Sequence, residues 1–101
     1  MILYNVTINI DEHVQQEWLS WMQNEHIPAV METGYFTNYK MYRILSRMEG
    51  ETGHTYSIQY FASNIEDYET YRDTQAARLQ EETARKFGNR FVAFRTLLEE
   101  V

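Results

Sequence analysis

The sequence predicts a single α+β domain over residues 1–101, in the order β-α-β-β-α-β. Two observations predict this fold. Four segments alternate apolar and polar residues, which is typical of strands with one buried face. Two longer segments place apolar residues at helical spacing. This order is that of the ferredoxin-like (split βαβ) plan, a four-stranded antiparallel sheet with both helices on one face.

The first half of the chain supplies a strand, a helix and a second strand. Residues 2–10, ILYNVTINI, alternate strictly, and Asp11 can cap the helix that follows through about residue 25. Pro28 disfavours helical geometry in the residue before it, so the helix is expected to end or kink near His26, with a short second turn closed by Gly34. Residues 35–47 are then extended.

The second half repeats the pattern. A glycine-containing segment, RMEGETGH, is expected to connect residues 35–47 to the antiparallel strand HTYSIQYFA. Ser63 or Asn64 caps a second helix that ends at Gly88. The last strand lies within residues 90–101.

With both helices on one face, the other face of the sheet is uncovered. It is expected to carry large apolar side chains among polar ones: Leu3, Gln59, Phe61 and Ala93 together with Asn5, Thr7, Ser57 and Arg95. Such a face favours burial against another sheet. The sequence therefore predicts a homodimer that pairs through the open sheet face.

Charge and composition exclude several classes of function. The net charge is −6 and only 9 residues are Lys or Arg, so neither nucleic acid nor an anionic membrane is an expected partner. No apolar segment is long enough to span a membrane, and no signal peptide is recognisable. The absence of cysteine fits a cytoplasmic protein.

Cofactor and metal sites are not predicted. No glycine-rich nucleotide loop, nucleophile elbow or HExxH pattern occurs. The three histidines, His13, His26 and His54, belong to separate elements without ligand spacing, so we expect no metal site.

Four segments together resemble a known family: YNVTINI, EWLSWMQNEHIPAVMETGYF, YSIQYFA and FGNRFVAFRTLLE. Over nearly its whole length the chain resembles an uncharacterised family of short bacterial proteins with a domain of unknown function. More distantly it is similar to the dimeric α+β barrel superfamily, which includes antibiotic-biosynthesis monooxygenase-like and EthD-like proteins. The resemblance implies a face-to-face homodimer, but no particular reaction.

His26 is the first candidate for chemistry. In barrels that the chain resembles, a histidine near the end of the first helix can reach the cleft between helices and sheet, where it could act as a general base. The alternative is that His26 only caps the last turn of the helix, where a cation also suits the helix dipole.

Aromatic and cationic residues complete the candidate ligand site. Trp18 and Trp21 could wall a pocket or simply pack in the core, and Tyr60 could donate a hydroxyl hydrogen bond. Arg43 and Arg95 could meet an oxyanion. If Arg95 points into the barrel, its charge must be compensated by an ion pair or by an anionic ligand.

Two functions are the main alternatives at this stage, and a third, a partner-binding surface at an exposed sheet edge, is less favoured because the edges are short. One is a small-molecule site, enzymatic or purely binding, in a cleft near His26. The other is a structural or regulatory dimer without a ligand site. A pocket with His26 inside it would favour the first, and a fully packed cleft with His26 in solvent would favour the second.

Overall fold

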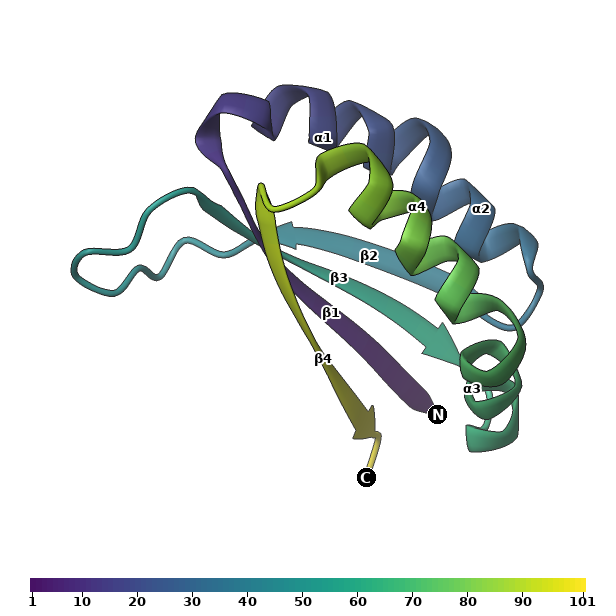
Figure 1. The fold of residues 1–101 in the computed structure, drawn as a ribbon. Helices are drawn as coiled ribbons and strands as arrows, with labels where there is room; N and C mark the ends of the chain where they lie inside the picture. The colour runs from purple at the N-terminus through teal and green to yellow at the C-terminus, as the bar shows by residue number, and fades with distance from the viewer.

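The computed structural model describes residues 1–101 and has the predicted order of elements. The strands are β1 (Ile2–Ile10), β2 (Asn38–Arg43), β3 (His54–Ala62) and β4 (Phe91–Glu99). They form one antiparallel sheet in the order β2-β3-β1-β4. The helices all lie over one face of this sheet (Figure 1). The ferredoxin-like α+β prediction is confirmed.

The first helical segment is irregular near His26. A 3-10 turn (Glu12–Val14) leads into α1 (Gln15–Trp21), a π-turn (Met22–His26) and α2 (Ile27–Glu32) without a break. Asp11 caps its start, as expected, by accepting a hydrogen bond from the backbone N–H of His13. The helix does not end near His26, but the irregularity expected there is present as a π-turn in which the Ile27 N–H donates to the Met22 carbonyl. The second turn after Pro28 is closed by Gly34, as expected, with a φ of 84°.

The second helical segment has the same construction. It consists of α3 (Ile65–Tyr71), a π-turn (Arg72–Ala76) and α4 (Ala77–Phe87). Asn64 caps its first turn by accepting from the Asp67 N–H at 2.9 Å. Gly88 closes its last turn with a positive φ of 58°, and its N–H donates to the Ala84 carbonyl. Both predicted caps are confirmed.

The core lies between the sheet and the helices. Every second residue of β1, from Ile2 to Ile10, is buried on this side, and the facing residues of β3 continue the layer. From the helices, the most deeply buried side chains are Trp18, Met22, Ile27, Val30 and Leu79.

The opposite face of the sheet is uncovered. Leu3, Asn5 and Thr7 of β1 lie there with Ser57, Gln59 and Phe61 of β3, as predicted. Two predicted members are wrong: Ala93 is the antiparallel partner of Ile8 and Arg95 that of Val6, so both lie on the helix side. The uncovered face instead receives Val92, Phe94, Thr96 and Leu98 from β4.

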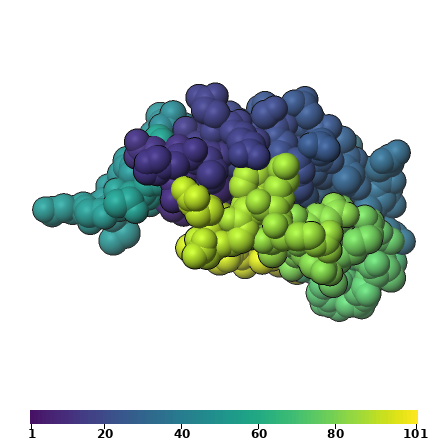
Figure 2. All heavy atoms as spheres, turned by 45° about the horizontal axis from the view of Figure 1, so that its top comes forward, coloured from purple at the N-terminus to yellow at the C-terminus, as the bar shows by residue number.

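Residues 44–53, which join β2 to β3, project from the body of the molecule (Figures 1 and 2). Leu45 and Met48 in this segment are almost fully exposed. No helix combines the length and the apolar character that crossing a bilayer would require.

Candidate functional site

A cavity lies between the helices and the sheet, under α4 and beside β4. The space in it that a water-sized sphere can reach is about 40 Å³, little more than one water molecule requires. Most of its lining is apolar, and it contains no Asp or Glu; the lining residues are Tyr4, Val6, Ile8, Met22, His26, Val30, Ile58, Tyr60, Tyr71, Leu79, Gln80, Thr83, Phe91, Ala93 and Arg95. The cavity thus joins both helical segments to β1, β3 and β4.

His26 lies in this cavity and does not cap a helix end. Its side chain makes no capping hydrogen bond, and its Nδ1 is buried without any hydrogen-bond partner. Burial, assisted by the nearby charge of Arg95, lowers the pKa of His26 to about 4. The imidazole is therefore neutral at pH 7, with one nitrogen able to accept a proton or a hydrogen bond.

The π-turn explains why His26 faces inward. Trp18, Met22, His26 and Val30 follow one another at four-residue steps, and each step in an α-helix rotates about 40° beyond a full turn. In a regular α-helix the side chains of this series would therefore turn progressively away from the sheet. The wider π-turn reduces this drift, so that Met22, His26 and Val30 all line the same cavity.

Tyrosines form one wall of the cavity. The rings of Tyr4 and Tyr60 stack with centroids 6.0 Å apart, and Tyr71 lies 6.1 Å from Tyr4. Burial raises the pKa of all three hydroxyls, so each remains a protonated donor at neutral pH. At Tyr4 burial is the main cause that raises the pKa, and the nearby charge of Arg95 acts in the opposite direction.

Arg95 lies at the mouth of the cavity. It lines the cavity and is exposed to solvent at the same time. None of the ion pairs of the protein involves Arg95. Of the two ion pairs that could compensate Arg95, a cross-strand pair with a glutamate is absent from this chain, and a pair with a glutamate of a second subunit stays a prediction.

Three other predicted site residues lie outside the cavity. Trp21 stacks on His26, with ring centroids 4.9 Å apart, and covers it from the α1 side. Trp18 is fully buried against Tyr56 in the core. Arg43 donates to Nδ1 of His54 at 2.7 Å on β2, the opposite edge strand from β4. The structure thus brings together His26, Tyr60 and Arg95 of the predicted set.

Sequence reasoning missed Tyr71 and Gln80 as cavity residues. Tyr71 could have been found, since it belongs to the apolar face of the second helix. Gln80 carries no such signal, because its inward placement depends on the π-turn at Arg72–Ala76.

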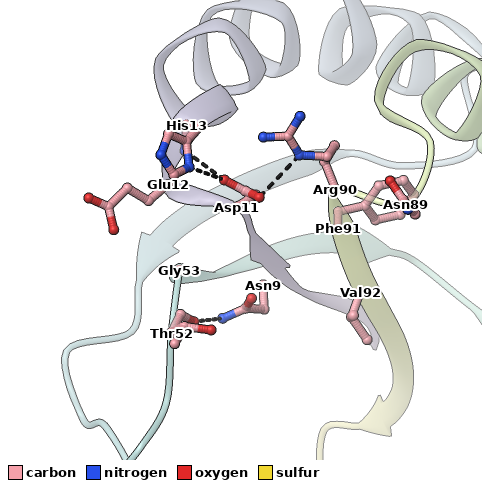
Figure 3. A pocket seen from close by; sticks show the side chains of 10 residues that line it. All are labelled: Asn9, Asp11, Glu12, His13, Thr52, Gly53, Asn89, Arg90, Phe91 and Val92. Atoms are coloured by element: carbon pink, nitrogen blue, oxygen red, sulfur yellow. Dashed lines mark hydrogen bonds and ion pairs between the residues drawn. The ribbon is translucent and has the colours of Figure 1, made fainter.

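A second hollow is open and polar, with about 310 Å³ of space (Figure 3). At its centre Asp11 accepts from Arg90 at 3.1 Å and from His13 at 3.0 Å, and these contacts hold the pKa of Asp11 well below its usual range. Asn9 donates to the Thr52 carbonyl nearby. Asp11, His13 and Arg90 are engaged with one another at this junction of β1, the 44–53 segment and β4.

Comparisons with known proteins agree with this fold. The model of the family "Domain of unknown function (DUF4286)" matches residues 1–101. No protein with curated function is significantly similar in sequence.

Among solved structures, an EthD family protein from Bacillus halodurans is 15% identical, with all of both chains covered and a TM-score of 0.68. A protein assigned as an antibiotic biosynthesis monooxygenase from Deinococcus radiodurans is 10% identical, with 100% of this chain and 93% of that chain covered and a TM-score of 0.69. A dimeric ferredoxin-like protein from an uncultured marine organism is 13% identical, with 100% and 95% covered and a TM-score of 0.64. At these identities the likeness establishes the fold alone, and the predicted resemblance is confirmed.

Proposed function

Since the chain belongs to the DUF4286 family, whose function is unknown, we propose from its geometry that it is a homodimeric barrel protein that binds a small molecule in the cavity around His26. The observation that carries the proposal is His26, which lines an apolar cavity and whose buried Nδ1 has no hydrogen-bond partner. Buried polar atoms in folded proteins almost always have a partner.

The cost of this arrangement supports a binding role. Leaving a buried acceptor or donor unpaired costs about 1–3 kcal/mol, and a histidine kept only for packing could be replaced by an apolar ring. A ligand group that pairs with the imidazole would recover this cost on binding. Strongly shifted pKa values, such as that of His26, also concentrate at functional sites.

The dimer forms through the uncovered sheet face. Val92, Phe94 and Leu98 of β4 are exposed there, and Leu3 and Phe61 lie beside them. Exposed apolar patches of this kind mark interfaces. A dimeric protein with the same fold provides a precedent, and pairing through this face leaves the cavity on the helix side accessible.

A dimeric module without a ligand is the second candidate. The observation that favours it is the small enclosed volume, about 40 Å³, which is less than most ligands need. The two candidates differ in one measurable respect: only the first requires that molecules added from solution reach His26.

The test is an NMR screen of small aromatic and aliphatic fragments against the purified protein, read at the imidazole nitrogens of His26. We expect a subset of fragments to shift these signals. Ala93→Leu, which fills the cavity, should abolish the shifts, whereas Ala84→Leu, at an exposed position of α4, should preserve them. If no fragment perturbs His26, the ligand site is wrong and the dimeric module stands.

A further inference from the structure

The charges of the cavity restrict what it can bind. Arg95 is its only charged residue, and it has no ion-pair partner in the chain. The cavity therefore carries one uncompensated positive charge, at its mouth. An anionic group is the complement, and a carboxylate fits the planar guanidinium with two parallel hydrogen bonds.

The inner end of the cavity offers a ligand uncharged hydrogen-bonding groups. His26 is neutral there and accepts through an unprotonated nitrogen, while the buried tyrosines offer hydroxyls. The whole cavity has about 40 Å³ of space, enough for one water molecule and therefore for one hydroxyl group, while the rest of a ligand has to lie at its opening. A ligand group that can both donate and accept at this position satisfies the orphaned imidazole.

Between these ends the surface is apolar and partly open. Phe91 and Ala93 are half-buried on β4 and line the cavity on the same side of the sheet as Arg95. A flat ring can lie on these side chains without entering the enclosed space. The bulk of a ligand thus remains at the mouth, and only its hydroxyl reaches inward.

We infer that the ligand is a small hydroxy-substituted aromatic carboxylic acid, with its carboxylate on Arg95, its ring on Phe91 and Ala93, and its hydroxyl at His26. This inference rests on the proposed function and adds the chemical class of the ligand. It assigns a specificity role to Arg95, whose partner is supplied by the ligand rather than by the protein.

The experiment measures the affinity of four probes at pH 7.5 by NMR titration. The probes are 3-hydroxybenzoate and 4-hydroxybenzoate, benzoate without the hydroxyl, and 4-hydroxybenzamide without the charge. We expect at least one hydroxybenzoate to bind the dimer about tenfold more tightly than the amide. Arg95→Gln should remove this preference. The matched control, Arg43→Gln on the opposite edge strand, should keep it.

Other outcomes separate the two proposals. If the amide binds as tightly as the acids, or if the preference survives in Arg95→Gln, the ligand class is wrong while the cavity remains a binding site. The class is equally wrong if none of the probes binds but other fragments reach His26. If neither probes nor fragments reach His26, the proposed function fails as well. If Arg95→Gln converts the dimer to a monomer, Arg95 belongs to the interface and the inference is overturned.

Discussion

The indole of Trp21 stacks on the imidazole of His26, with ring centroids 4.9 Å apart and planes inclined by 30°. The other side of the indole meets Phe87 edge-on, at 5.4 Å, so α1 and α4 are joined over the histidine. His26 is thereby shielded on one side by an aromatic ring and opens on the other to the cavity. Desolvation, the main cause of its lowered pKa, depends on this cover.

Replacing Trp21 by leucine should therefore raise the pKa of His26 from about 4 toward its usual value of 6.5. The smaller side chain lets water reach the imidazole, which favours the protonated form. NMR titration of the histidine signals measures the shift. Tyr39→Leu, which removes a partly exposed ring on β2, serves as the control and should leave the value unchanged. An unaltered pKa in Trp21→Leu would contradict the shielding role.

The stability of the protein should decrease as the pH falls from 6.5 to 4. In this window the unfolded chain protonates His26 while the folded chain does not. The unfolded state therefore binds more protons and is stabilised relative to the folded state as the pH falls. The loss from this residue is at most about 3 kcal/mol. Urea unfolding at several pH values should show a flatter dependence for His26→Phe.

The control for this pH dependence is Tyr39→Leu, which removes a partly exposed ring on β2 and leaves His26 and its surroundings in place. It should retain the wild-type slope between pH 6.5 and 4. Asp11 and Asp73, whose pKa values are lowered in the folded protein, add to the slope only at the acid end of this window, where the unfolded chain begins to protonate them, and His26→Phe leaves both in place. Equal slopes for the wild type and His26→Phe would show that the histidine is not kept neutral by burial.

The order of the elements could be predicted because it depends on local periodicity. Residues 2–10 alternate between apolar and polar, and helix caps occur at Asp11, Asn64 and Gly88. Each of these features depends only on residues that are close together in the sequence. For β1 and β3, the residues on the uncovered sheet face could also be predicted, because alternate residues of a strand lie on opposite faces of the sheet.

The site could be predicted only in part. His26 and Tyr60 were recognised by residue type, but the inward position of His26 depends on a π-turn, which has no clear sequence signature. Arg95 was assigned to the wrong face because β4 alternates large and small residues on both sides. The face on which Arg95 lies is determined only by its pairing with Val6 of β1, a residue far away in the sequence.

The uncovered sheet face gives a prediction about assembly. Phe94 is 61% exposed and pairs with Thr7 at the centre of this face. Phe94→Glu places a charge where the second copy should pack, and should weaken dimerisation at least about tenfold. Sedimentation velocity over a concentration series measures this. Ile65→Glu, at the exposed start of α3, is the matched control and should dimerise normally.

This assembly model fails under either of two results. One is a wild-type protein that sediments as a monomer at every concentration. The other is a Phe94→Glu variant that sediments as the wild-type dimer does, because the interface would then lie elsewhere.

Two glycines of the projecting segment should differ in their tolerance of alanine. Gly50 and Gly53 both have positive φ, 82° and 72°, so alanine costs about 1 kcal/mol in either position. At Gly53 the added Cβ would also lie 2.6 Å from the carbonyl oxygen of Ile10, whereas at Gly50 no atom lies within 4 Å. Gly53→Ala should thus lower the free energy of unfolding by at least about 2 kcal/mol.

Urea unfolding of the two variants provides the measurement, with Gly50→Ala as the control for backbone strain alone. The difference between them isolates the contact of Gly53 with the end of β1, beside the Asp11 and Arg90 pair (Figure 3). Equal destabilisation would mean that the 44–53 segment can move away from β1 at little cost. A larger loss for Gly53→Ala means that this close approach anchors the projecting segment to the sheet.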